Sequence, residues 1–360
     1  MKTDLIRKVY IFRMRKKLVC PFRTSLGQHD VLDNMTMSLE LGGGIRGFGE
    51  AAVATHITGE TIEETSANLS RFAGRIIGRD IVDYAAVAGE AREFLGSNKA
   101  ALAAVETALL DALTRRLRIP LWRFFGPRAG KLSTDVTIVI SDVEDSVRAA
   151  REFRRKGFRV FKIKIGSDPD SDYKRVMAVQ KIIGRSRIYL DANQGYTAEQ
   201  TLELLKGLRK GGCIPDLLEQ PVLKNDVEGL AKVTRSTKVP VCADESARSI
   251  PDCLNLIRRK ACRVINIKIM KTGIFEAREI VSIAKAAGLG LMAGGMMETS
   301  LSMTASAHLA AGLSGFRYID LDTPFFIKGG RTGNPYLSPS GVYDLSKVKA
   351  GIGIIPVFES

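Results

Sequence analysis

The sequence predicts an α/β protein in which a closed parallel barrel of the (β/α)₈ type follows an α+β region. From Thr134 onward, short apolar runs alternate with helical patterns, with one pair in roughly every 25 residues, and such alternation is typical of parallel sheets. Eight apolar runs can be counted, which is the number that closes a barrel. The alternative, an open doubly wound sheet, would carry a G-x-G-x-x-G segment after its first strand, and none is found there.

The N-terminal region has the pattern of a small α+β unit. We predict three strands of an antiparallel meander, at residues 8–14, 33–41 and 45–52. Thr61 and Glu64 have the spacing of a capping box that opens a helix. Residues 99–117 are rich in Ala and Leu and predict a strong helix, which Pro120 ends.

The barrel elements follow in regular order. The eight strands are predicted at residues 134–140, 158–165, 188–191, 214–219, 239–243, 264–268, 289–293 and 317–321. The helices between them are predicted at residues 143–156, 170–183, 197–210, 227–235, 250–259, 274–287 and 301–311. The Gly- and Pro-rich residues after Asp322 are expected to form a tail that returns to the N-terminal region.

The composition argues against several functional classes. The 360 residues carry a formal net charge of +15, but Lys and Arg are scattered beside Glu and Asp, as on a solvated surface. No basic run is interleaved with aromatic residues, so we expect no nucleic-acid partner. A binder of nucleic acid or anionic surfaces remains the alternative from another class, and its binding would depend strongly on salt.

The sequence also bears on location and on cysteine and histidine chemistry. The sequence has no stretch of 18 apolar residues and no apolar signal core at its N-terminus, so we expect a cytoplasmic protein with no membrane partner. None of the five cysteines forms a C-x-x-C pair, which argues against a zinc ribbon or a disulfide scaffold. The three histidines lack H-E-x-x-H spacing, which weakens the case for a zinc site or a histidine base.

Two lysines occupy the second predicted barrel strand. Lys162 and Lys164 are two residues apart, so in a strand they project from the same face. If that face points into a barrel, a buried lysine pair is costly unless it has a function. The alternative is a basic edge strand with solvated lysines.

Acidic residues end the next three predicted strands. Asp191, Glu219 and Asp244 therefore meet at one rim of a barrel, where three carboxylates repel one another unless a cation lies between them. Oxygen ligands with open positions suit Mg²⁺. We interpret the three acids as metal ligands, and Asn193 and Glu245 as residues that orient them.

The lysines then gain a chemical role. Lys164 and Lys268 are expected on opposite walls of the barrel mouth, where a neutral lysine is a competent base. Lys162 and the metal ion would lower the pKa of that base. The ion would also stabilise the charge that develops when a carboxylate substrate loses its α-proton. Two bases on opposite faces predict epimerisation or racemisation.

These motifs resemble the enolase superfamily, in its muconate-lactonizing-enzyme subgroup, over nearly the whole chain. The matching segments are Gly47-Phe48-Gly49-Glu50-Ala51, Lys162-x-Lys164, Asp191-Ala192-Asn193-Gln194-Gly195, Glu219-Gln220-Pro221, Ala243-Asp244-Glu245-Ser246 and Asn266-Ile267-Lys268-Ile269-Met270-Lys271. The resemblance implies Mg²⁺ and a (β/α)₇β modified TIM barrel with an N-terminal α+β capping domain. We therefore expect the capping domain at residues 1–125, the barrel at 126–325 and the tail at 326–360.

Within the subgroup, Asp320-Leu321-Asp322 resembles the Asp-x-Asp of dipeptide epimerases, which binds the substrate's α-ammonium group. The resemblance also implies that further substrate-binding positions match Thr137, Gly295, Met296, Met297 and Glu298. A Mg²⁺-dependent epimerase of L,L-dipeptides is thus predicted, acting on a small molecule and expected to be a homo-oligomer.

One departure from the pattern concerns specificity. The arginine that grips the side-chain carboxylate in Ala-Glu epimerases matches Gly27 here, and Arg23 is displaced along the loop. We therefore predict a dipeptide with an uncharged or larger second residue. The alternatives are o-succinylbenzoate synthase, muconate cycloisomerase and N-acylamino-acid racemase, which would use the same lysines and metal but have no specific need for Asp320 and Asp322.

Overall fold

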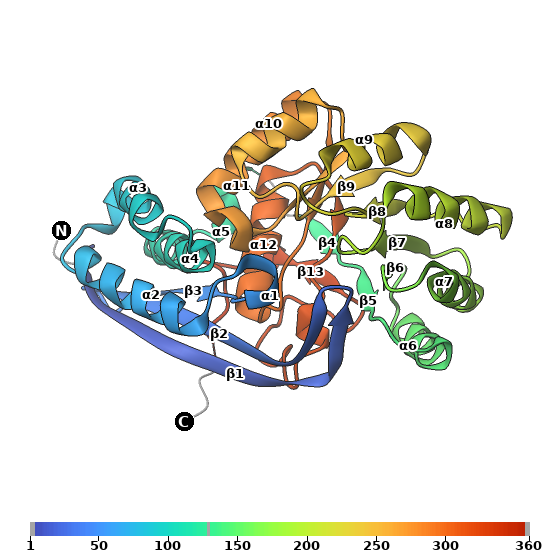
Figure 1. Ribbon diagram of the computed structural model, residues 1–360. Coiled ribbons are helices and arrows are strands. Elements are labelled where there is room, and N and C mark those ends of the chain that lie inside the picture. Colours follow the sequence, from blue (N-terminus) through green and yellow to red (C-terminus); the bar gives the residue numbers. More distant parts are fainter. Residues whose placement is uncertain (1–3, 128–129, 357–360) are drawn as a thin grey trace.

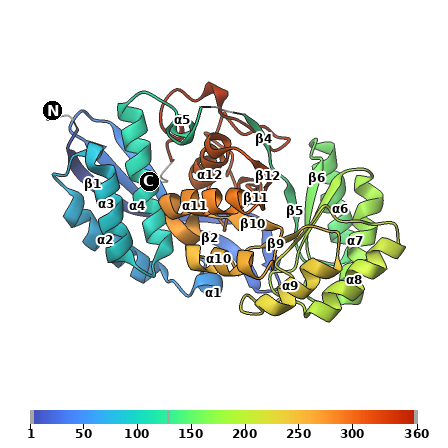
Figure 2. The same ribbon diagram turned by 90° about the horizontal axis from the view of Figure 1, so that it is seen from above.

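The computed structural model describes residues 4–127 and 130–356 of the chain. They form an α+β cap and a parallel barrel that lie side by side (Figure 1). Figure 2 shows the same two parts from above, with the cap strands and helices on one side and the barrel strands and their helices on the other. No helix among these residues combines the length and the apolar character that crossing a membrane requires.

The cap is built on an antiparallel sheet of three strands, β1 (Ile6–Thr24), β2 (Gly27–Leu41) and β3 (Arg46–Ala51). The predicted meander is present, but its first two strands run far beyond the predicted ranges. The extra length is a two-stranded ribbon that extends past the body of the cap (Figure 1). The pair of Arg13 and Asp33, at 2.8 Å, lies at the base of the ribbon, and the charged residues beyond it obscure the apolar pattern of the strands.

The cap helices lie against this sheet, and they are α1 (Thr55–Thr58), α2 (Ile62–Ile76), α3 (Tyr84–Leu95), α4 (Lys99–Arg116) and α5 (Leu121–Phe125), with a 3₁₀ turn at Ile81–Asp83. The N-cap half of the capping box predicted for α2 is present, since the Glu64 backbone N–H donates to Thr61 Oγ1 at 3.1 Å. Helix α4 is buried on all sides from Ala100 to Thr114, because it lies between the cap sheet and the barrel. That position explains why it is rich in Ala and Leu around its whole circumference.

The barrel has eight parallel strands in sequential order, β5 (Val136–Ile138), β6 (Val160–Lys164), β7 (Arg187–Asp191), β8 (Leu217–Glu219), β9 (Val241–Ala243), β10 (Val264–Ile267), β11 (Gly290–Ala293) and β12 (Phe316–Ile319). The connecting helices are α6 (Val143–Arg155), α7 (Pro169–Ile183), α8 (Ala198–Lys210), α9 (Val227–Ser236), α10 (Ile250–Arg258), α11 (Ile269–Ala286) and α12 (Ser300–Leu313). The first and last strands, β5 and β12, are brought together where the backbone N–H of Asp135, just before β5, donates to the Ile319 carbonyl at 2.9 Å. The predicted modified TIM barrel with a cap is thus confirmed.

Helix α11 starts five residues earlier than predicted and has a break inside it. Gly273 adopts φ 77°, a left-handed conformation that favours glycine. The second half of the helix begins there, and Glu106 of α4 accepts its first N–H groups, from Ile274 at 2.5 Å and Phe275 at 3.1 Å. A cap carboxylate therefore sits at the N-terminus of a barrel helix, where the helix dipole favours negative charge.

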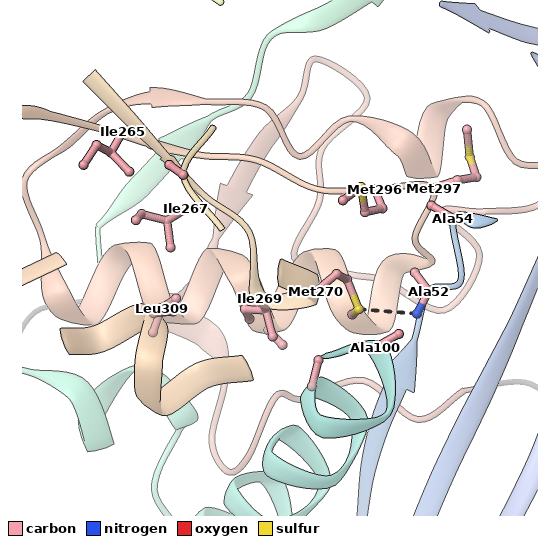
Figure 3. Close-up of a cluster of buried hydrophobic side chains, with 14 of the residues drawn as sticks. Ala52, Ala54, Ala100, Ile265, Ile267, Ile269, Met270, Met296, Met297 and Leu309 are labelled. Carbon is pink, nitrogen blue, oxygen red and sulfur yellow. Dashed lines mark hydrogen bonds between the residues drawn. The ribbon is translucent and has the colours of Figure 1, made fainter. Parts of the chain in front are cut away.

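The cap and barrel also meet through apolar side chains near the barrel mouth (Figure 3). The Ala52 backbone N–H, at the end of β3, donates to Met270 Sδ at 3.3 Å. Ala54 lies beside Met296 and Met297 of the loop after β11 (Figure 3). This contact brings the cap within reach of the ends of the barrel strands.

The segment after β12 crosses back to other parts of the fold. It contains 3₁₀ turns at Thr323–Phe325 and Leu345–Lys347, and the strand β13 (Val342–Asp344), which pairs with β4 (Lys131–Ser133). Near its end, Gly351 exchanges backbone hydrogen bonds with Ile119 and Leu121 of the cap, at 2.9 and 2.8 Å.

Strand β3 and helix α4 approach so closely that a side chain at Gly49 would overlap the Ala104 carbonyl. We predict that Gly49→Ala lowers the free energy of unfolding by about 1–3 kcal/mol, because the added methyl overpacks this contact. Urea unfolding followed by circular dichroism would measure the change. The matched control is Gly89→Ala in α3, where a Cβ meets nothing within 4 Å, and we expect it to be neutral or slightly stabilising. Equal stability of the Gly49 variant and the wild type would contradict the prediction.

Candidate active site

A cavity opens at the carboxyl ends of the barrel strands, where the cap ribbon meets the barrel. Its cap side is lined by Phe22, Thr24, His29, Ala54 and Ile57. Its barrel side is lined by Thr137, Lys162, Lys164, Asn193, Lys268, Gly295, Met296, Met297, Asp320, Asp322 and Thr323. Most of the residues that the sequence singled out therefore face one space.

The tip of the β1–β2 ribbon covers part of this cavity because it is tied to the barrel. Ser25 Oγ is within hydrogen-bonding distance of the carbonyls of Ala192 and Asn193, at 2.8 and 2.9 Å. The alternation of the strand directs Phe22 and Thr24 toward the cavity. Arg23 lies on the other face.

Lys162 and Lys164 lie side by side in the barrel mouth. Strand β6 is hydrogen-bonded to β5 and β7 on its two sides, so the alternative of an edge strand with solvated lysines is wrong. The Lys162 ammonium lies 2.9 Å from Asp191, 2.7 Å from Glu219 and 2.7 Å from Asp320. This side chain is 2 % exposed, so its charge is stabilised by these carboxylates rather than by water.

The three predicted metal ligands end successive strands. Asp191 is the last residue of β7, Glu219 is the last of β8, and Asp244 follows β9 directly. Burial opposes ionisation of Asp191, but the ammonium groups of Lys162 and Lys164 outweigh it and lower the pKa of Asp191 to about 2. Burial, together with the charge of Asp191, raises the pKa of Glu219 to about 8.

Lys268 lies on the opposite wall, and Lys271, to which the sequence analysis gave no role, lies beside it against Asp244. Lys268 Nζ lies 2.6 Å from Asp244, and Lys271 Nζ donates at 2.8 Å to the same carboxylate and to the Asn266 carbonyl. Burial works against the charge of Lys268, but Asp244 and Glu219 outweigh it and raise the pKa of Lys268. The Lys-x-x-Lys spacing at residues 268–271 was the signal that could have identified Lys271.

Amide side chains connect the charged groups. Asn193 accepts a hydrogen bond from Lys164 Nζ at 2.9 Å and donates to Glu245 at 3.2 Å. Its φ of 39° lies in the left-handed region, which is uncommon outside glycine and frequent at functional sites. Asn266, like Lys271, was not singled out, and it donates to Glu219 Oε1 at 2.6 Å.

The donor set of Asp191, Glu219 and Asp244 fits Mg²⁺ chemically. All three offer carboxylate oxygens at one rim, and Glu219 Oε2 makes no hydrogen bond although it lies close to Lys162. In this structure, ammonium groups contact the three carboxylates. Within the described residues, the acids whose oxygens all lie within 4.8 Å of one another are instead Asp135, Asp320 and Asp322.

This second acidic group lies beside the cavity and contains a residue that the sequence analysis missed. Asp322 Oδ2 accepts the Thr137 backbone N–H at 2.6 Å, and Asp320 accepts from Lys162. Asp135 is two residues before Thr137 and is fully buried. Its only signal in the sequence was an acidic residue at the start of the first barrel strand.

The loop after β11 forms the remaining wall, and a cap residue holds it in place. Glu50 accepts the Thr299 backbone N–H at 2.9 Å and Asn34 Nδ2 at 2.7 Å, while Asn34 also donates to the Met297 carbonyl at 2.9 Å. Glu298 does not reach into the cavity but accepts the Met296 backbone N–H at 2.6 Å within its own loop. Burial raises the pKa of Glu298 to about 7.

Comparisons with known proteins agree with this geometry. Residues 6–126 match the family model "Mandelate racemase / muconate lactonizing enzyme, N-terminal domain", and residues 145–359 match "Enolase C-terminal domain-like". A hydrophobic dipeptide epimerase of Citrifermentans bemidjiense is 44% identical over 96% of both chains.

Two solved structures are also similar over nearly the whole length. The dipeptide epimerase of Enterococcus faecalis, in complex with Mg and L-Leu-L-Tyr, superimposes with a TM-score of 0.92 at 32% identity, over 97% of this chain and 99% of that chain. The L-Ala-D/L-Glu epimerase of Bacillus subtilis, as a substrate-liganded complex, gives a TM-score of 0.93 at 31% identity over 98% and 99%. The chain therefore belongs to the enolase superfamily, in its mandelate racemase/muconate lactonizing enzyme subgroup and within the dipeptide epimerase family of isomerases.

Proposed function

We propose that the protein is a Mg²⁺-dependent epimerase of L,L-dipeptides that removes the α-proton of the C-terminal residue from one face and adds a proton to the other. The observation that carries the proposal is the placement of Lys164 and Lys268. They belong to β6 and to the end of β10, which are four strands apart in an eight-stranded barrel. The two amines therefore approach the cavity from opposite sides.

Asp191, Glu219 and Asp244 are the residues that would hold the ion. A bound Mg²⁺ supplies positive charge that stabilises the substrate carboxylate when its α-carbon becomes negatively charged. The relative from Enterococcus faecalis was solved as a complex with Mg, which supports this assignment. Asn266 would orient Glu219, and Asn193 would orient Glu245 and Lys164.

The lysines carry the proton. One of them, as the neutral amine, takes the α-proton, while the other, as the ammonium, delivers a proton to the opposite face of the same carbon. The C–H bond that breaks is replaced by a new C–H bond, so the substrate inverts and the two lysines exchange protonation states. Lys162 contributes a fixed positive charge beside Asp191 and Glu219.

Asp320 and Asp322, named here the ammonium pair, would bind the N-terminal ammonium of the dipeptide. Both face the cavity next to Thr137, and two carboxylates suit a cation with several donors. Substrates of the alternative reactions do not require such a pair. The assignment therefore favours a dipeptide with a free amino group.

The walls of the cavity favour an apolar second residue. Phe22, Met296 and Met297 line it, while Arg23 is bound to Gln28 at 2.8 and 3.0 Å on the outer face of the ribbon. Gly27, the position that matches the glutamate-gripping arginine, has φ 148°, a conformation that an arginine would adopt only with strain. The similar epimerase of Citrifermentans bemidjiense, which is named for hydrophobic dipeptides, supports this specificity.

The proposal predicts which dipeptides react. In D₂O, a mixed L,L-dipeptide library should gain deuterium at one Cα, fastest where the second residue is large and apolar, because such a side chain is buried against the apolar wall. L-Ala-L-Leu should exceed L-Ala-L-Glu in kcat/KM by about tenfold or more. Mass spectrometry and proton NMR would measure both.

The Arg23→Ala variant is the control and should keep the wild-type ratio, since Arg23 lies outside the cavity. A library that stays unlabelled while succinylhydroxycyclohexadiene carboxylate is dehydrated would assign the site to o-succinylbenzoate synthesis instead.

The two-base arrangement predicts the behaviour of lysine variants. Lys164→Ala and Lys268→Ala should each lower the rate of epimerisation by about 10²–10⁴-fold, because each removes one proton carrier. Each variant should still exchange the α-proton of the enantiomer served by the remaining lysine, which NMR in D₂O would detect. Lys174→Ala, an exposed lysine on α7, should keep full activity. Full turnover in both active-site variants would rule out the scheme.

The metal assignment predicts a loss of affinity. Asp244→Asn should weaken Mg²⁺ binding by about tenfold or more, because it replaces a charged ligand with a neutral one. Isothermal titration of the chelator-treated protein would measure this. Asp170→Asn on the exposed start of α7 should leave the affinity unchanged. Equal Mg²⁺ affinity in the Asp244 variant and the wild type would count against the ligand set.

A further inference from the structure

No hydrogen-bond donor among the described residues contacts the carboxylate of Asp135. The residue is fully buried between β4 and β5, and neither of its carboxylate oxygens has a hydrogen-bond partner among the described residues. Its backbone is fixed, because its N–H donates to Ile319 at the seam of the barrel. A buried carboxylate in that position is costly, so its state requires an explanation.

The surroundings of Asp135 add negative charge. Oxygens of Asp320 and Asp322 lie within 4.8 Å of an Asp135 oxygen, and these two neighbours do have donors, Lys162 and the Thr137 backbone. Lys162 is the nearest cation, but it is shared with Asp191 and Glu219. It cannot balance three acids here as well.

One proton relieves this repulsion, and the contacts indicate where it resides. The ionised forms of Asp320 and Asp322 each receive a hydrogen bond, whereas ionised Asp135 would receive none. Burial, followed by the charges of Asp320 and Asp322, raises the pKa of Asp135 well above its usual range, and Lys162 opposes this only in part. Burial, followed by the charge of Asp135, raises the pKa of the nearby Tyr189 phenol, so that side chain stays neutral and does not balance the acids.

We propose that Asp135 is a neutral carboxylic acid that donates a hydrogen bond to Asp320 and so positions the ammonium pair for the substrate. This role rests on the proposed function. Asp135 is a positioning residue, since it would act through Asp320 rather than touch the dipeptide. A neutral Asp135 adds no charge that repels Asp320 and Asp322, which favours their ionised forms for the substrate ammonium.

Two variants separate this role from a merely structural one. Asp135→Asn keeps a donor of the same shape and should change kcat/KM for L-Ala-L-Leu by less than about threefold. Asp135→Ala removes the donor to a charged group and should raise KM by about tenfold or more, with a smaller effect on kcat. For N-acetylated L-Ala-L-Leu, which lacks the ammonium, the two variants should not differ. Equal kinetics of Asn and Ala with the free dipeptide would overturn the proposal.

A spectroscopic measurement tests the protonation state without any substrate. The infrared difference between the wild type and Asp135→Asn at pH 7 should show the carbonyl band of a carboxylic acid in the wild type. Loss of carboxylate bands instead would overturn the proposal. If no dipeptide were epimerised, the proposed function would fail, but the infrared result would still decide the state of Asp135.

A second metal ion in the group of Asp135, Asp320 and Asp322 is the competing explanation. Two of the oxygens of this group already have partners, since Lys162 lies 2.7 Å from Asp320 and the Thr137 backbone N–H donates to Asp322 Oδ2. Calorimetry with Mg²⁺ on the wild type and on Asp135→Asn should give the same number of binding sites. A site that is present in the wild type and lost in the variant would overturn the proposal.

Discussion

The ammonium group of Lys162 is the interaction on which the architecture of the site depends. It lies among Asp191, Glu219 and Asp320, which come from three different places in the barrel, and it is almost fully removed from water. Removing one partner of such a buried cluster leaves the others uncompensated, which is far more costly than losing a surface ion pair. Lys162 thereby links Asp191 and Glu219 on one side of the mouth to Asp320 on the other.

The cap shapes the mouth of the cavity. Its ribbon reaches across the mouth, and Ser25 ties the tip to the loop after β7. Glu50 and Asn34 hold the loop after β11 from the other direction. Lys162 and Lys164 thus stand on a barrel strand and Lys268 directly follows one, while cap residues line the other side of the cavity.

Positive and negative side chains are unevenly distributed around the mouth. Around Asp244 two lysines neutralise one acid, whereas around Asp135, Asp320 and Asp322 three acids share part of one lysine. The first arrangement lowers the pKa of Asp244, and the second raises the pKa of Asp322 to about 7, through burial and the charge of Asp320. The site therefore has one side that is prepared for an anionic substrate group and another that is prepared for a cationic one, as a dipeptide requires.

The sequence by itself determined the fold class and most of the site, because both follow from local patterns. Alternating strands and helices specify a parallel barrel, and its carboxyl ends must meet, so Asp191, Glu219, Asp244 and the lysines could be placed at one rim from their positions alone. The outward turn of Arg23 depends on the hairpin register, and the length of the ribbon depends on cross-strand pairs, neither of which a local pattern shows.

Only the tertiary structure decided the contacts between distant segments. Asp135 becomes unusual because closing the barrel places it against Asp320 and Asp322, about 185 residues further along the chain. Glu50 acquires its role for the same reason, since it reaches a barrel loop that follows it by about 250 residues. Such groups carry no periodic signal in the sequence, because their environment is made by residues far away along the chain.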